Sequence, residues 1–230
     1  AENNGTGVTG VAYNAKIMSV KVLGSNGTGY LSNVAKGIRY AADNGANVIN
    51  LSLGSASGSI ELESAIQYAW GKNVGVMMAA GNNSALSPSF PAAYAAKYGI
   101  AVGATDSNGN LASFSNKAGT NPLDYVTAAG VGVVSTIPGG SYASLSGTSM
   151  ASPYLAGAMA LLMQANRSSG RNLSIGELES LFTSTASNTT TVAAASTTAL
   201  PTTTSLPGST ATVNSEPTKD SQNNDSPSPL

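Results

Sequence analysis

Ser149 is the residue of this sequence best placed to do chemistry. It lies in segment 147–153, which reads GTSMASP, and an apolar helix is predicted from residue 151 to about residue 164. A hydroxyl at the start of a helix lies at the positive end of the helix dipole, where backbone N–H groups stabilise an anion. It can therefore act as a nucleophile, although capping the helix is the commoner role of a serine at this place.

The chain lacks the side chain that most often activates a serine. A serine hydroxyl is a poor nucleophile until a base removes its proton, and the 230 residues include no His. Lys21 is a poor substitute, because it lies in a predicted buried strand and its spacing does not direct it toward Ser149. Asp43, Asp106 and Asp124 follow helix, strand or loop signals and are interpreted as turn or cap residues.

The composition excludes several classes of partner and site. With 10 basic and 11 acidic residues the net charge is −1, which gives no footprint for nucleic acid and no polybasic patch for a membrane. The longest apolar run, residues 156–163, is far too short to span a bilayer, and no signal segment is visible. Without Cys or His, the chain forms no disulfide and no thiolate or imidazole metal site.

The chain divides into two parts of different composition. In residues 184–230, 21 of 47 positions are Ser or Thr and five are Pro, and apolar periodicity is lost. Such a segment buries too little surface to offset its chain entropy, so a disordered tail is predicted after a domain over residues 1–183. An O-glycosylated stalk or a linker is the alternative for the tail.

Strands and helices alternate in the first part. Helical spacing predicts helices over 31–44, closed by Gly45, and over 59–72, capped by Ser59. Continuous apolar runs predict strands over 17–23, 48–53, 74–80 and 100–104. This order is typical of an α/β fold with a parallel sheet between two layers of helices. Ligands bind such sheets at the carboxyl ends of the strands, and here a glycine follows three of those ends.

Six segments in the same order resemble the subtilisin-like serine proteases, the subtilases of peptidase family S8. The GTSMASP segment resembles the nucleophile motif of that family. The other five are VKVL at 20–23, VINLSLG at 48–54, AAGN at 79–82, FPAAY at 90–94 and IAVGATD at 100–106. The resemblance covers about the last two thirds of a catalytic domain and not the tail. It implies a three-layer subtilisin-like fold over residues 1–183 that is N-terminally incomplete.

The resemblance assigns two catalytic roles. Ser149 would be the acylating nucleophile, and the side-chain amide of Asn82 would form the oxyanion hole with the backbone N–H of Ser149. Such preorganised donors stabilise the negative charge that develops in the tetrahedral intermediate more than they stabilise the ground state. A turn residue after a strand is the alternative for Asn82.

The resemblance also outlines a substrate cleft. Two edge segments would sandwich an extended peptide by β-augmentation. These segments are Gly27, Thr28 and Gly29, and Ser52, Leu53 and Gly54. One wall of the pocket for the residue before the scissile bond would be formed by Ala79, Ala80 and Gly81, whose small size suits large apolar side chains. The resemblance further implies an apolar pocket upstream in the cleft, and ordinary core is the alternative for its residues. These residues are Leu23, Leu31, Val34, Leu53 and Leu62.

Segment 2–8 resembles the family's calcium loop. Asn4 would supply a side-chain oxygen, and Glu2, Thr6 and Val8 would supply carbonyl oxygens. Ca²⁺ takes 6–8 oxygens, and the family's other ligands would precede Ala1, so the predicted site is incomplete. A plain Gly/Asn turn is the alternative.

Two functions are expected from these features. The first is a secreted, monomeric serine endopeptidase acting on polypeptides, whose triad Asp and His would precede Ala1, so that this chain alone is inactive. The second is a catalytically inactive subtilase-like module that binds extended peptides or has a structural role.

Overall fold

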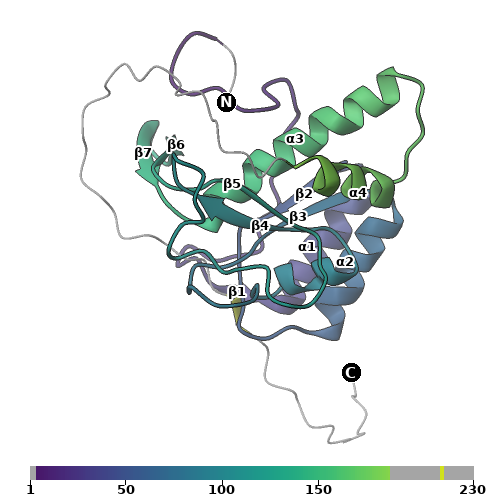
Figure 1. The fold of residues 1–230 in the computed structure, drawn as a ribbon, viewed down its shortest axis with the longest axis horizontal. Coiled ribbons are helices and arrows are strands. Elements are labelled where there is room, and N and C mark those ends of the chain that lie inside the picture. Colours follow the sequence, from purple (N-terminus) through teal and green to yellow (C-terminus); the bar gives the residue numbers. More distant parts are fainter. Residues whose placement is uncertain (1–3, 187–212, 215–230) are drawn as a thin grey trace, which may run out of the picture.

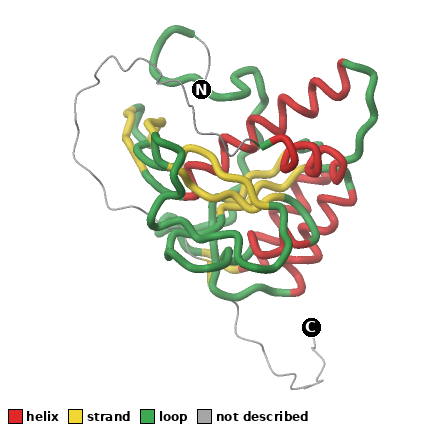
Figure 2. Tube along the Cα trace, viewed as in Figure 1, coloured by secondary structure: helices red, strands yellow, loops and turns green. Residues whose placement is uncertain are grey.

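A parallel sheet of four strands forms the centre of the molecule (Figures 1 and 2). The computed structural model describes residues 4–186 and 213–214. The strands are β2 (Val48–Leu51), β3 (Gly75–Ala79), β4 (Ile100–Thr105) and β5 (Tyr125–Ala129), hydrogen-bonded in that order. Three of them coincide with predicted strands, whereas β5, which reads YVTAA, was not predicted.

Helices cover both faces of this sheet. Helices α1 (Leu31–Asp43) and α2 (Ile60–Gly71) lie on one face, and α3 (Thr148–Ser168) and α4 (Ile175–Thr185) lie on the other. Side chains alternate along β3, so Met78 packs toward α1 and α2 while Met77 packs toward α3. Both methionines are fully buried. The predicted three-layer α/β architecture is therefore confirmed.

Local signals set the ends of the predicted helices. Gly45 has a φ of +85°, the left-handed conformation that closes α1. The Ser59 hydroxyl accepts a hydrogen bond from the Leu62 N–H and caps α2. Helix α3 begins at Thr148, three residues before the predicted start, because Gly147 is its N-cap.

The remaining elements lie around the sheet. The first short strand, β1 (Gly29–Tyr30), pairs in parallel with β8 (Val213–Asn214). An antiparallel hairpin is formed by β6 (Val133–Ile137) and β7 (Ser141–Leu145), and a short 3₁₀ helix, η1 (Ala92–Ala96), follows the cis Phe90–Pro91 bond. Ser184 and Thr185 close α4, so these two positions and β8 differ from the predicted disordered tail. The rest of the predicted tail, from 187 on, lies outside the described residues.

The strand predicted over 17–23 is wrong. This segment carries no ladder hydrogen bonds, and the side chain of Ile17 is 88% exposed. An apolar β-branched run forms a strand only beside a partner, and no described strand pairs with it. Val20 and Val22 pack instead against the core cluster that includes α1, and Lys21 is exposed rather than buried.

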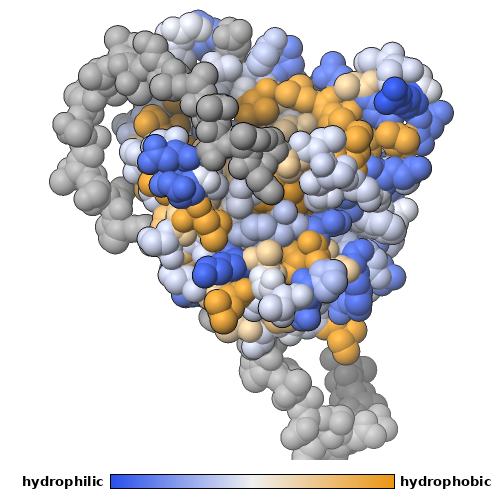
Figure 3. Space-filling model, in the orientation of Figure 1, coloured by the Kyte–Doolittle hydropathy of each residue, from blue (hydrophilic) through white to orange (hydrophobic). Residues whose placement is uncertain are grey.

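Apolar side chains remain on part of the surface. Figure 3 shows them gathered over α3 and α4 on the face in view. Among the apolar residues of these helices, Leu161 of α3 is 44% exposed and Leu181 of α4 is 37% exposed. Within the described residues, helices are too short or too polar to cross a lipid bilayer.

Candidate active site

The carboxyl ends of β2 and β3 meet the first turn of α3, and this junction contains both predicted catalytic residues. Thr148 donates from its backbone N–H to Asn82 Oδ1 at 2.8 Å and from its hydroxyl to the same atom at 2.9 Å. The Gly81 N–H in turn donates to Thr148 Oγ1 at 3.1 Å. The chain thereby joins two segments that are 66 residues apart.

These bonds orient the Asn82 carboxamide. Because a backbone N–H only donates, the atom that Thr148 contacts must be the carboxamide oxygen. The amide nitrogen therefore points the other way, and a Cβ built on Gly147 would lie 3.2 Å from it. Asn82 thus presents its two N–H donors beside the start of α3, where Ser149 is the second helical residue.

Ser149 is half-buried and held against the end of β2. Ser52 Oγ donates to the Ser149 carbonyl at 2.8 Å, and Ser149 Oγ lies 3.5 Å from the Ser52 carbonyl. Asn50 supports this contact, since its Nδ2 donates to Ser52 Oγ at 3.0 Å and its Oδ1 accepts from Ser152 Oγ at 2.7 Å. Among the described residues, no titratable side chain forms a hydrogen bond with Ser149 Oγ.

The other predicted cleft residues fall into two groups. Ala79 and Ala80 lie at the end of β3 and are 3% and 0% exposed, close before Asn82 in the chain. Gly27 and Thr28 lie in a separate turn, where Asn26 Oδ1 accepts from the Thr28 N–H and hydroxyl. No described hydrogen bond joins that turn to the Ser149 junction.

The remaining cleft positions belong to β1 and to the segment after β2. Gly29 begins β1 and pairs with Val213. Leu53 is 7% exposed, and Gly54 precedes Ser55, which bridges to Phe90. Four of the residues considered for an upstream pocket lie in the hydrophobic core, namely Leu31, Val34, Leu53 and Leu62. Leu23 is partly buried against that core.

The calcium loop is a turn in the part of it that is described. Asn4 Oδ1 accepts from the Thr6 N–H at 3.1 Å and the Thr6 hydroxyl at 2.9 Å, and both residues are exposed. Val8 follows this turn, and Glu2 lies outside the described residues. One side-chain oxygen that already accepts two hydrogen bonds, together with two carbonyls, falls well short of 6–8 oxygens. The described residues therefore do not form a calcium site by themselves.

Two residues of the junction were not predicted from the sequence. Thr148 lies in the same motif as Ser149, but nothing in the sequence indicates that it forms hydrogen bonds with Asn82. Asn116 lies in the loop between β4 and β5 and is 0% exposed. Its Nδ2 donates to the Ala80 carbonyl at 3.0 Å. A buried polar side chain of this kind is recognisable only once its partners are known, because they lie more than 25 residues away.

Comparisons with known proteins show which family the chain resembles. A sequence model of the subtilase family, Peptidase_S8, matches residues 1–221. An alkaline protease from Alkalihalobacillus alcalophilus is 53% identical over 168 residues, which cover 73% of this chain and 43% of the relative. Subtilisin BL from Lederbergia lenta is 52% identical over 168 residues, which cover 73% of this chain and 61% of the relative.

A solved structure shows the same fold. The crystal structure of a cold adapted subtilisin-like serine proteinase superposes with a TM-score of 0.68 at 38% identity, covering 76% of this chain and 62% of that one. The chain thus spans about half the length of the curated relatives that it matches. From the family match, the sequence identity and the shared α/β fold together, the chain belongs to the subtilase family of subtilisin-like serine proteases.

Proposed function

We propose that this chain carries the nucleophile and the oxyanion hole of a serine endopeptidase that cleaves polypeptides. Ser149 Oγ would attack the scissile carbonyl, and the negative charge that develops on the carbonyl oxygen would be stabilised by the Asn82 amide and the Ser149 N–H. The observation that carries the proposal is the pair of hydrogen bonds from Thr148 to Asn82 Oδ1, which leaves the amide donors of Asn82 beside the first turn of α3.

The proton of Ser149 needs an acceptor that these 230 residues do not supply. The chain has no His, and Lys21 is exposed. We therefore assign the His base and its orienting Asp to the part of a longer protein that the relatives have and this chain does not cover. The chain alone would then fail to cleave casein and would react only slowly with a fluorophosphonate.

A second candidate follows from the same lack of a base. The chain would then be a module that binds extended polypeptides at the ends of β2 and β3 and cleaves nothing. The two candidates differ in whether Ser149 forms a covalent bond to an acyl group.

An exogenous base separates the two candidates. The chain is mixed with an N-acetyl tetrapeptide p-nitrophenyl ester that ends in Phe, with and without imidazole, and acylation is followed by mass spectrometry. In the proposed step the Ser149 Oγ–acyl bond forms, p-nitrophenolate leaves, and imidazole takes the proton. We expect imidazole-dependent acylation of Ser149 that Ser149→Ala abolishes.

The contrary result is equally clear. Saturable binding of the same peptide as an amide, with no acyl group on Ser149 at any imidazole concentration, would support the binding module and contradict the endopeptidase.

The remaining assignments rest on the resemblance alone. We propose that the protein is secreted and monomeric, and that Glu2, Asn4, Thr6 and Val8 contribute to a structural Ca²⁺ site that other residues complete. A melting temperature of this chain that is the same in Ca²⁺ and in a chelator is the expected result if the loop alone binds no calcium.

A further inference from the structure

Asn116 holds the segment that carries Asn82, and we propose that it is a positioning residue of the oxyanion hole. This inference rests on the proposed function, because the oxyanion hole is part of that proposal. Asn116 forms no hydrogen bond with Ser149. Its side chain is fully buried and lies in the loop after β4, 34 residues beyond Asn82 in the sequence.

The Asn116 carboxamide makes four hydrogen bonds, and all of them reach one segment. Oδ1 accepts from the backbone N–H groups of Asn83 and Ala85, both at 3.0 Å. Nδ2 donates to the Ala80 carbonyl at 3.0 Å and to Ser89 Oγ at 3.1 Å. The partners lie before and after Asn82, so the carboxamide fixes the chain on both sides of that residue.

The backbone of Asn116 adds a fifth bond to the same segment, and its side chain leaves no room beside Gly81. Its N–H donates to the Gly81 carbonyl at 2.9 Å. A Cβ built on Gly81 would lie 2.4 Å from Asn116 Nδ2, far inside van der Waals contact. The segment and the Asn116 side chain are therefore closely packed.

Asn116 is in turn fastened to the sheet. Its carbonyl accepts from the Tyr125 hydroxyl at 2.8 Å and from Ser115 Oγ at 3.2 Å. Ser115 Oγ also accepts from the Ala104 N–H at 3.0 Å. Tyr125 belongs to β5 and Ala104 to β4, so Asn116 connects the segment around Asn82 to the rigid sheet.

Asn82 thus lies between two anchors. Thr148 holds its side-chain oxygen from the α3 side, and Asn116 holds the backbone of its two neighbours, Gly81 and Asn83, from the sheet side. Displacement of about 1 Å in a group that stabilises a transition state lowers a rate by roughly 100-fold. A residue that fixes the backbone on both sides of Asn82 therefore acts on the rate of acylation through Asn82.

The test uses the 230-residue chain and the imidazole-supported acylation of Ser149. Asn116→Asp keeps the acceptor for the Asn83 and Ala85 N–H groups but replaces the donor that faces the Ala80 carbonyl. We expect the limiting acylation rate constant to fall by about 30-fold while half-saturation by the ester changes by less than about 2-fold. The same substitution in an Asn82→Ala background should cost less than about 3-fold, because the group being positioned is already absent.

A matched control lies at the other end of α3. Asn166 clamps Leu173 with a similar pair of amide bonds, donating to its carbonyl at 3.3 Å and accepting from its N–H at 3.4 Å. Asn166→Asp should leave the acylation rate constant within about 2-fold of the parent. Equal losses from Asn116→Asp in the parent and in the Asn82→Ala background, or no loss in either, would overturn the inference.

A second readout separates this inference from the proposed function. If the parent chain never acylates Ser149, the proposed function fails, and the positioning is read from amide hydrogen exchange. In Asn116→Ala the Asn83 and Ala85 N–H groups should exchange at least about 100-fold faster, while the amide of Leu173 is unchanged. Unchanged protection of Asn83 and Ala85 would overturn the positioning.

The milder variant Ser89→Ala covers the case in which Asn116→Ala does not fold. It removes one of the two partners of Nδ2 and should raise exchange at Asn83 and Ala85 by about 3-fold. No increase at either amide would contradict the inference.

Discussion

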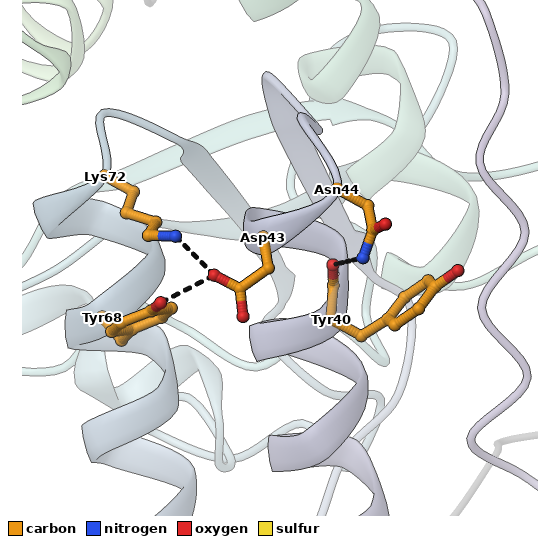
Figure 4. A network of polar contacts seen from close by, with 5 residues as sticks. All are labelled: Tyr40, Asp43, Asn44, Tyr68 and Lys72. Atoms are coloured by element: carbon orange, nitrogen blue, oxygen red, sulfur yellow. Dashed lines mark hydrogen bonds and ion pairs between the residues drawn. The ribbon is translucent and has the colours of Figure 1, made fainter.

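Two polar clusters join distant segments of this chain, and they are built in opposite ways. The Asn116 cluster beside the candidate active site is buried and consists of neutral amides and hydroxyls. The cluster around Asp43, which joins α1 and α2, is exposed and charged (Figure 4). Asp43 Oδ1 accepts from the Tyr68 hydroxyl at 2.6 Å and from Lys72 Nζ, and the cations of Lys72 and Arg39 lie 4.9 and 4.8 Å from the centre of the Tyr68 ring.

The difference determines how firmly each cluster holds the segments that it joins. Side chains of Lys72 and Asp43 are 42% and 48% exposed, so water and salt screen their attraction and both can find other partners. The Asn116 side chain is 0% exposed and has no water to turn to, so leaving one of its polar groups unpaired costs about 1–3 kcal/mol. The buried cluster can therefore hold Asn82 in one position, whereas the exposed cluster adds only a modest connection between two helices.

The largest expected effect comes from a glycine of the buried region, and a glycine beside the exposed cluster provides its control. Gly81 and Gly45 both have positive φ values, +108° and +85°. A Cβ at Gly81 would meet Asn116 Nδ2 at 2.4 Å and Ser89 Oγ at 2.8 Å, whereas a Cβ at Gly45 meets nothing within 4 Å. Gly81→Ala should lower the free energy of unfolding by about 4 kcal/mol, the sum of left-handed strain and overpacking.

Gly45→Ala is the matched control for that measurement. It carries the left-handed strain without the clash and should cost about 1–2 kcal/mol. Urea denaturation of both variants gives the comparison directly. Equal losses for the two would show that the space around Asn116 is not tight and would break the contrast between the regions.

Glu179 distinguishes the effect of burial from the effect of charge, because it is an ionisable side chain in a buried position. It is 3% exposed, its Oε2 accepts from Trp70 Nε1 at 2.8 Å, and its Oε1 has no partner among the described residues. Burial raises the pKa of Glu179 from 4.5 to about 7; the hydrogen bond from Trp70 opposes the rise, and nearby Asp124 adds to it.

This shift predicts a definite dependence of stability on pH. Between pH 4.5 and about 7 the folded chain holds a proton on Glu179 that the unfolded chain has lost, so stability falls as the pH rises. The loss across this window is about 3 kcal/mol, since one pKa unit corresponds to about 1.4 kcal/mol. Glu179→Gln should remove most of the slope in urea melts at pH 4.5, 6 and 8.

Asp124→Asn serves as the control for this experiment. Burial also raises the pKa of Asp124, so its removal should reduce the slope but not abolish it. The same slope in Glu179→Gln as in the parent would mean that Glu179 is charged in the folded chain at pH 6.

The same contrast explains what could be predicted from the sequence. Helices α1 and α2 follow from apolar spacing with a cap at Ser59 and a stop at Gly45, all of which are local signals. Ser149 and Asn82 stand out because each lies in a motif and at the end of a predicted element. Short-range patterns therefore sufficed for these two helices and for three strands of the sheet, whereas the roles proposed for Ser149 and Asn82 came from the resemblance to the subtilases.

Contacts between distant segments could not be predicted in this way. Asn116 looks like one more polar loop residue in the sequence, and its importance comes from partners 27 to 36 positions away. Residues 17–23 have the composition of a strand, but a ladder needs a neighbour that composition does not reveal. The turn at Asn4 likewise follows from local sequence, but local sequence does not reveal which oxygens of distant segments lie near the Asn4 side chain.

The smallest effect is expected from Asp43→Asn in the exposed cluster. Hydrogen bonds from Lys72 and then Tyr68 lower the pKa of Asp43, so its stabilisation is present above the ordinary carboxyl pKa and is lost as the pH falls through the lowered value. At pH 7 the variant should shift the urea midpoint less than Gly81→Ala or the Glu179 titration, and the shift should shrink further in about 0.5 M NaCl. Urea melts in low and high salt measure this shift. A loss as large as that of Gly81→Ala, unaffected by salt, would show that the exposed cluster fixes geometry as firmly as the buried one.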